Sequence, residues 1–101
     1  MMRRVKPSHG NLVSMQIKST EIFDKKYEKI YRANSKIGSS VDAKVSLLLE
    51  NPRHPSLRLH KITRAGIGAW SISVNMKLRL IFVYRDYGIL LVDIGDHDEV
   101  Y

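Results

Sequence analysis

Apolar and polar side chains alternate with a period of two over much of the second half of the chain, which is the pattern of half-buried β-strands. Residues 69–75 read AWSISVN and carry Trp70, Ile72 and Val74 on one face. Residues 78–85 read LRLIFVYR and carry on one face Leu78, Leu80, Phe82 and Tyr84. We predict that the two segments form a β-hairpin whose apolar face, Trp70 included, belongs to the core.

The length of the hairpin loop decides which residues of the two segments pair. With a three-residue loop at 75–77 the two apolar faces coincide, and Trp70 lies opposite Phe82. A two-residue loop would set apolar side chains against polar ones. The pattern therefore selects the three-residue loop, which also places Arg79 on the open face of the hairpin beside Ser71.

Three further segments are predicted to be strands of the same sheet. Residues 12–18, LVSMQIK, alternate as a short first strand. In residues 57–63, LRLHKIT, the two leucines point inward while Arg58 and His60 point outward. Residues 89–94, ILLVDI, lack alternation and indicate a central strand covered on both faces.

Between the first strand and the others, two apolar stripes recur at the spacing of α-helices. We assign Ser19 as the N-cap of the first helix and Gly38 as the residue that stops it. Ser39 is then the N-cap of the second helix, with Asp42 completing a weak capping box, and the Asn-Pro step at 51–52 ends that helix. Two helices joined by so few residues are predicted to form an antiparallel hairpin that packs on the sheet.

The order of these elements predicts an α+β fold: a short N-terminal strand, an antiparallel two-helix hairpin and four strands of a mostly antiparallel, twisted sheet (β-α-α-β-β-β-β). The length of 101 residues suits one core, so we predict a single domain over residues 12–101 after a flexible basic arm over residues 1–11. The chain has no cysteine, no signal-peptide pattern and no apolar run of about 20 residues. We therefore expect a cytoplasmic protein without a membrane span.

Charge is distributed unevenly along the chain. The formal net charge is +7, and residues 51–85 carry seven Lys or Arg side chains but no Asp or Glu. Residues 86–101 carry five acidic side chains but no Lys or Arg. A basic block followed by an acidic tail indicates a polyanionic partner for the middle of the chain, although a solvated basic surface has the same composition.

Three segments resemble successive blocks of the RelE/ParE superfamily of toxins from toxin–antitoxin systems, particularly its RelE/StbE and YafQ-like branch. They read LLENPRHPSLRLHKI (48–62), AWSISVNMKLRLIFVY (69–84) and LLVDIGDHDEVY (90–101). The likeness extends over residues 12–101 and implies a RelE-like fold. It also implies a ribosome-dependent mRNA endonuclease, or mRNA interferase, whereas members of the ParE branch inhibit DNA gyrase on the same fold.

Cleavage of RNA without a metal ion needs a base for the 2′-hydroxyl, a cation for the phosphate oxygens and an acid for the leaving 5′-oxygen. An imidazole exchanges protons near neutral pH, and an arginine fork binds two phosphate oxygens. We assign His97, which lies between Asp96 and Asp98, to acid–base chemistry and Arg79 to the scissile phosphate. The position of Tyr101 in the terminal motif of the resembling toxins implies stacking on a base or help in proton transfer.

The remaining site residues come from the basic block. The predicted RNA-binding residues are Arg58, His60, Lys61 and Arg64. His60 is also a second candidate for the base. Each assignment has a structural alternative, since His97 also suits a solvated strand end and Arg79 is equally placed for an ion pair with Asp93 or Glu99.

Metal binding is not predicted. The four histidines are His9, His54, His60 and His97, and they lack the tight spacing of metal ligands. We interpret the His54-Pro55 step as a turn that enters a strand, and we predict no cofactor.

Three functions stay open at this point: cleavage of mRNA in the ribosomal A site, inhibition of gyrase, and RNA binding without catalysis. The acids of the tail would repel a phosphate, so they either hold His97 protonated or indicate a member that has lost nuclease activity. For the toxin classes, the resemblance implies a cognate antitoxin whose acidic, amphipathic segment folds on binding.

Overall fold

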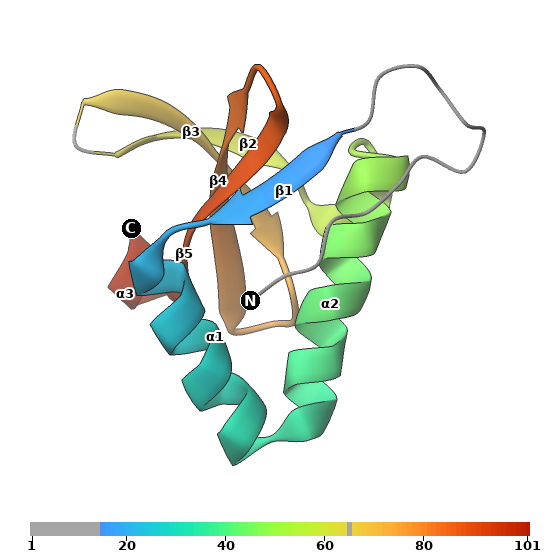
Figure 1. Cartoon of the computed structure of the whole chain (residues 1–101), viewed down its shortest axis with the longest axis vertical. Helices are drawn as coiled ribbons and strands as arrows, with labels where there is room; N and C mark the ends of the chain where they lie inside the picture. The colour runs from blue at the N-terminus through green and yellow to red at the C-terminus, as the bar shows by residue number, and fades with distance from the viewer. Residues whose placement is uncertain (1–14, 65) are drawn as a thin grey trace.

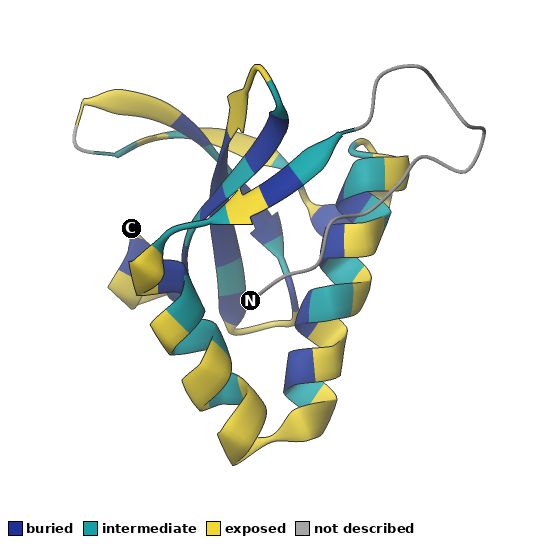
Figure 2. Ribbon diagram, viewed as in Figure 1, coloured by how far each residue is buried: buried dark blue, intermediate teal, exposed yellow. Residues whose placement is uncertain are grey.

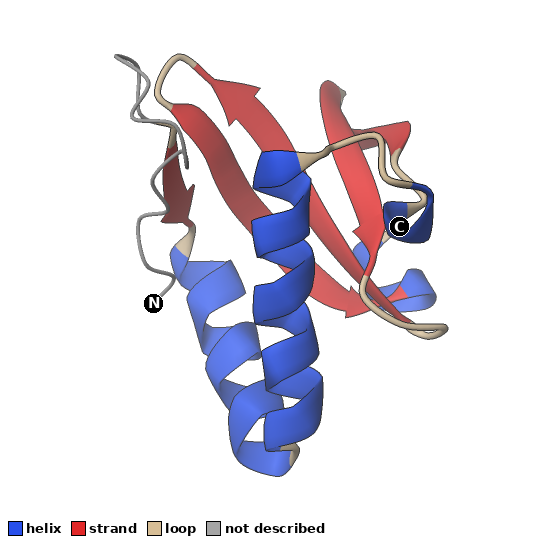
Figure 3. Cartoon of the chain, turned by 90° about the vertical axis from the view of Figure 1, so that its right-hand side faces the viewer, coloured by secondary structure: helices blue, strands red, loops and turns tan. Residues whose placement is uncertain are grey.

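The computed structural model describes residues 15–64 and 66–101, in which a helical hairpin packs on one face of a sheet (Figures 1 and 3). The helices of the hairpin are α1 (Glu21–Ala33) and α2 (Ser35–Glu50). The strands are β1 (Gln16–Ser19), β2 (His60–Arg64), β3 (Ile67–Ser73), β4 (Leu78–Arg85) and β5 (Gly88–Asp96). A short 3₁₀ helix, η1 (Pro55–Leu57), precedes β2, and a single helical turn, α3 (His97–Val100), follows β5.

The five strands of the described sheet lie in the order β1-β5-β4-β3-β2. β1 runs parallel to β5, whereas the other neighbouring strands are antiparallel. This arrangement confirms the predicted α+β fold with its helical hairpin and mostly antiparallel sheet. No helix within 15–64 and 66–101 combines the length and apolar character that crossing a membrane would require.

The predicted register of the hairpin formed by β3 and β4 is confirmed. Trp70 pairs with Phe82 and Ser73 pairs with Arg79, and the strands close through a hydrogen bond from the Val74 amide to the Leu78 carbonyl at 2.9 Å. Trp70 lies on the core side as predicted, but its side chain is only partly buried.

The main core lies between the helical hairpin and the sheet (Figure 2). Fully buried side chains on its two sides include Phe23, Val41 and Leu48 from the helices and Ile72, Leu80, Phe82 and Leu91 from the strands. A smaller cluster on the opposite face of the sheet joins Ala69, Ile81 and Val83 to Val100 of α3. Burial of Val100 therefore fixes α3 to the open face of the sheet, away from the helical hairpin.

A β-bulge in β5 explains why ILLVDI does not alternate. The pairs between β4 and β5 shift between Phe82–Leu91 and Ile81–Asp93, so that one extra residue, Val92, lies in β5. Leu91 thus faces the helices while Asp93 turns to the other face. The prediction that this strand is covered on both faces is only partly correct, because Val92 is only partly buried.

The helix boundaries differ from the predicted ones at three positions. Thr20, and not Ser19, caps α1: its Oγ1 accepts a hydrogen bond from the Phe23 amide at 3.1 Å. Asn34 ends α1 and caps α2, because its side chain accepts hydrogen bonds from the amides of residues 36 and 37. Ser39 is therefore inside α2 and caps nothing. The predicted helix end at Asn51-Pro52 is correct.

Gly38 has a different role from the one predicted. It is a buried residue of α2, and a Cβ placed on it would lie 2.3 Å from the Tyr31 ring of α1. The glycine is needed because the two helices approach closely at this point, and not because a helix ends there.

The segment 57–63 is only partly a strand. Leu57 ends η1, and Arg58 follows in the left-handed conformation with φ of 48°. The strand begins only at His60. The predicted arm over 1–11 and the start of the predicted first strand, residues 12–14, lie outside the described residues.

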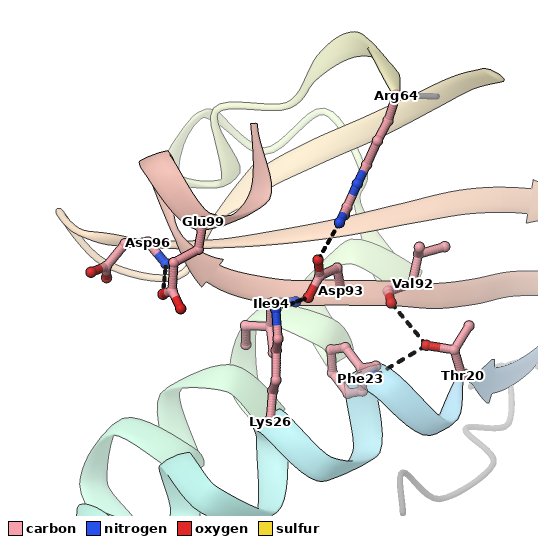
Figure 4. Close-up of polar contacts among 9 residues, drawn as sticks. All are labelled: Thr20, Phe23, Lys26, Arg64, Val92, Asp93, Ile94, Asp96 and Glu99. Carbon is pink, nitrogen blue, oxygen red and sulfur yellow. Dashed lines mark hydrogen bonds and ion pairs between the residues drawn. The ribbon is translucent and has the colours of Figure 1, made fainter. Parts of the chain in front are cut away.

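The Asp93 carboxylate ties three elements together (Figure 4). Its two oxygens accept hydrogen bonds from Lys26 of α1 at 2.8 Å and from Arg64 of β2 at 2.5 Å, and one also accepts from the Ile94 amide. Burial by itself would raise the pKa of this carboxyl, but the three hydrogen bonds and the charge of Arg64 outweigh burial and lower the pKa below its usual value.

We expect Asp93 to stabilise the fold above its unfolded-state pKa of about 3.9 and to lose this contribution as the pH falls through its lower folded-state pKa. Asp93→Asn should lower the free energy of unfolding at pH 7 by at most about 3 kcal/mol, because the two cations are partly solvated. Urea denaturation from pH 7 to pH 2 should show the difference between wild type and variant shrinking. Asp98→Asn, at an exposed carboxylate, is the control, and a variant as stable as wild type at pH 7 would contradict this role.

Candidate functional site

Arg79 is the centre of a polar cluster on the open face of the sheet. Its Nε donates hydrogen bonds to Ser71 Oγ at 2.9 Å and to the Tyr101 hydroxyl at 3.1 Å. Its Nη2 lies 3.3 Å from the Arg58 carbonyl oxygen and 3.2 Å from His60 Nδ1. These contacts hold the guanidinium in one orientation. None of the hydrogen bonds among residues 15–64 and 66–101 uses Nη1, so its two N–H groups remain for a ligand.

The Tyr101 hydroxyl joins the other members of the cluster. It hydrogen-bonds to Ser71 Oγ and lies 3.1 Å from His60 Nε2, in addition to its contact with Arg79. Ser71 is fully buried beneath it. The Tyr101 side chain stays about half exposed, so it is anchored at its hydroxyl while much of its surface faces solvent.

His97 completes the cluster through a ring contact. Its imidazole meets the Tyr101 ring edge to face, with the ring centroids 4.3 Å apart. The imidazole is 69% exposed, and its Nδ1 lies 3.7 Å from an Asp98 oxygen. His97 is thus the member of the cluster with the freest access to a ligand. We call these five residues, His60, Ser71, Arg79, His97 and Tyr101, the Arg79 cluster.

The alternation of the strands explains why these side chains meet. Cross-strand partners share a face, and the pairs His60–Ser71 and Ser73–Arg79 put all four residues on the open face. The tail reaches the same face because α3 turns the chain back across β4. Val100 anchors that turn in the smaller apolar cluster, and the Glu99 carboxylate accepts a hydrogen bond from the Asp96 amide at 2.8 Å.

The structure brings together His97, Arg79, Tyr101 and His60, with the Arg58 backbone beside them, and it separates Lys61 and Arg64 from this group. Lys61 pairs with Trp70 and therefore lies on the opposite face of the sheet. Arg64 is bound to Asp93. The structural alternative that Arg79 pairs with Asp93 or Glu99 is also wrong, since Asp93 is held by Lys26 and Arg64.

Two features of the site were missed by sequence reasoning. Ser71 was placed beside Arg79 but was given no role, although its hydroxyl contacts both Arg79 and Tyr101. Arg58, predicted for its side chain, contributes its backbone carbonyl to the site, because this carbonyl, at the left-handed turn, lies 3.3 Å from Arg79 Nη2. The alternation of β3 gives a signal for Ser71, whereas nothing in the sequence indicates the turn at a non-glycine residue.

An apolar groove of about 350 Å³ lies elsewhere on the open face. Its apolar lining residues are Ile22, Ile67, Ala69, Ile81, Val83, Leu90 and Val92. Ile22 and Ile67 are 60% and 62% exposed, Arg85 adds positive charge at the groove, and the ion pair of Arg64 with Asp93 also lines it. The groove therefore combines apolar walls with basic side chains.

Metal ligands do not converge in the part of the chain that the structure describes. Within residues 15–64 and 66–101, no three side chains of the His, Asp or Glu type are grouped as a metal ion would require. His54, one of the histidines considered above, is instead the N-cap of η1, where its Nδ1 accepts a hydrogen bond from the Ser56 amide.

Solved structures with the same fold come from toxin–antitoxin systems. YafQ from E. coli strain BL21(DE3) matches with a TM-score of 0.71 and 18% identity, over 87% of this chain and 99% of that one. A YoeB/ParE toxin from Agrobacterium tumefaciens matches with a TM-score of 0.73 and 13% identity, over 82% and 99%. The YoeB-YefM toxin-antitoxin complex from Staphylococcus aureus matches with a TM-score of 0.69 and 15% identity, over 84% and 99%.

At the level of sequence, no protein-family model matches the chain, and no curated protein matches it. The structural likeness nevertheless confirms that the chain has the fold of the RelE/ParE toxin superfamily.

Proposed function

We propose that the chain is the toxin of a type II toxin–antitoxin system and that it cleaves mRNA in the ribosomal A site without a metal ion. The observation that carries this proposal is the convergence of Arg79, Tyr101 and two histidines on one open face. The toxins of the same fold support the class of protein. The chemistry rests on the cluster alone.

Arg79 binds the scissile phosphate in this proposal. Its Nε and Nη2 are held by groups of the protein, which leaves the two N–H groups of Nη1 directed away from those contacts. A guanidinium fixed in this way stabilises the charge that develops on the phosphate oxygens without having to reorient during the reaction.

Tyr101 and His60 remove the proton of the 2′-hydroxyl. The Tyr101 oxygen takes this proton while its own proton passes to His60 Nε2, 3.1 Å away. His60 accepts at Nε2 in the tautomer whose Nδ1–H donates to the Arg58 carbonyl oxygen, 3.4 Å away. In this tautomer Nδ1 does not accept from Arg79 Nη2, which is then held by its hydrogen bond to the Arg58 carbonyl. His60, the second candidate for the base, thus acts through Tyr101.

His97 protonates the leaving 5′-oxygen. Its ring is exposed beside Tyr101, and its Nδ1 lies 3.7 Å from an Asp98 carboxylate oxygen. The 2′-oxygen forms a bond to phosphorus as the bond to the 5′-oxygen breaks. The products are a 2′,3′-cyclic phosphate and a free 5′-hydroxyl, and one proton has passed from His97 to the leaving group.

Purified protein added to translating ribosomes tests the proposed function. Mapping of mRNA 5′ ends should show cuts inside codons on ribosome-bound message. Inhibition of gyrase supercoiling without any cut would instead support the ParE-like function. RNA binding without either effect would support a non-catalytic domain.

The same assay tests the assignments of Arg79 and His97. Arg79→Ala and His97→Ala should each lower the cleavage rate by roughly 10² to 10⁴, because each removes a group that acts on the reacting atoms. Circular dichroism should be unchanged, since neither side chain belongs to the main core. Lys29→Ala, at an exposed lysine of α1 on the helical side, removes one positive charge and should cleave like wild type. Full activity of both site variants would exclude the mechanism.

The groove on the open face supports the second part of the proposal, a cognate antitoxin with an acidic, amphipathic segment. Ile22 and Ile67 offer apolar surface to such a segment, and Arg85 offers positive charge.

Salt should separate the two kinds of partner. RNA binding depends on phosphate neutralisation and should be lost at a few hundred millimolar salt. A complex that also buries the apolar groove should survive, because burial of apolar surface is not screened. Co-purification of the product of a neighbouring gene across a salt gradient measures this difference. A neighbour that fails to bind, or one that dissociates as readily as RNA, would count against the toxin–antitoxin assignment.

A further inference from the structure

A second basic site is a pocket of about 270 Å³ formed by the segment that connects α2 to β2. It adjoins the Arg79 cluster through Arg58. Its lining residues are Arg53, His54, Pro55, Arg58 and Leu59. None of these is acidic, and both arginines are exposed. The pocket therefore offers two guanidinium groups beside the apolar surfaces of a proline and a leucine.

His54 adds a neutral donor to this pocket. Its Nδ1 accepts a hydrogen bond from the Ser56 amide at 3.1 Å, so Nδ1 carries no proton in that arrangement. The proton of the neutral ring is then on Nε2, which is a hydrogen-bond donor. Two cations, one N–H donor and a small apolar surface match the phosphate and ribose of a nucleotide.

Arg58 connects the pocket to the Arg79 cluster within a single residue. Arg58 is one of the residues that line the pocket, and its carbonyl oxygen lies 3.3 Å from Arg79 Nη2. Its left-handed backbone, unfavourable for a non-glycine residue, allows the two halves to face the two sites at once. A chain of nucleotides bound at Arg79 would have its neighbouring phosphate near this pocket.

We propose that the pocket of Arg53, His54 and Arg58 is a second phosphate subsite, which binds a nucleotide next to the scissile phosphate of a single RNA strand. This inference rests on the proposed function, since it takes Arg79 as the scissile-phosphate site. It assigns substrate positioning to Arg53 and to the Arg58 side chain. The Arg58 backbone sets the spacing between the subsites.

Binding of short RNA to the full chain tests the subsite without any cleavage. The probes are a 2′-O-methylated trinucleotide with two phosphates and its two isomers in which one phosphate is a neutral methylphosphonate. At low salt, fluorescence anisotropy should show wild type binding the doubly charged probe about tenfold more tightly than either isomer, because a charge-assisted contact is lost in each.

Variants locate the second contact. Arg53→Ala and Arg58→Gly should each bind the doubly charged probe only about as tightly as they bind the isomer that keeps the charge at the scissile position. Arg79→Ala should weaken binding of the doubly charged probe and of that isomer. Glycine at position 58 keeps the left-handed turn and removes only the side chain. Lys29→Ala should keep the tenfold preference, since it removes a charge from the helical side.

The outcomes distinguish the subsite from the proposed function. If Arg53→Ala and Arg58→Gly keep the full preference while Arg79→Ala loses affinity, the subsite is wrong and the RNA-binding role of Arg79 stands. If wild type binds none of the three probes, the subsite is overturned, whereas the proposed function, which concerns ribosome-bound message, is decided by the cleavage assay on translating ribosomes.

Discussion

A slip of one residue between β3 and β4 would turn every side chain of β4 to the other face of the sheet. Leu80 and Phe82, both fully buried against the helices, would then face solvent, and Arg79 would enter the core. Burial of these side chains makes such a slip costly. The register that fills the core is therefore the same register that presents Arg79 beside Ser71 on the open face. The packing of the core and the geometry of the Arg79 cluster therefore both depend on the pairing of β3 with β4.

Because the alternation expresses this constraint directly, the hairpin register and the place of Arg79 were predictable from sequence. The helix caps were not, since Ser19 is the better capping residue by intrinsic preference, whereas the structure uses Thr20, whose hydroxyl also donates to the Val92 carbonyl of β5. Gly38 shows the same limit. A glycine needed for close approach to Tyr31 looks, in sequence, like a glycine that ends a helix.

The candidate site was predictable where it follows from strand faces and unpredictable where it follows from irregular backbone. His60 and Arg79 share a face through regular pairing, and the resemblance pointed to His97 and Tyr101. Lys61 was misassigned because it was chosen for its charge, although the predicted alternation, with His60 pointing outward, already puts Lys61 on the other face, where the structure has it. Arg64 was misassigned for a different reason. Its partner, Asp93, is brought to the open face by a bulge that the sequence does not mark.

The central claim is that the Arg79 cluster cleaves RNA by attack of the 2′-oxygen on the neighbouring phosphorus. The chemical identity of the ends produced on ribosome-bound mRNA tests this claim most directly. Attack by the 2′-oxygen leaves a 2′,3′-cyclic phosphate, or the 3′-phosphate formed by its hydrolysis, together with a 5′-hydroxyl. Fragments that carry a 3′-hydroxyl and a 5′-phosphate would show that water was the nucleophile and would contradict the mechanism.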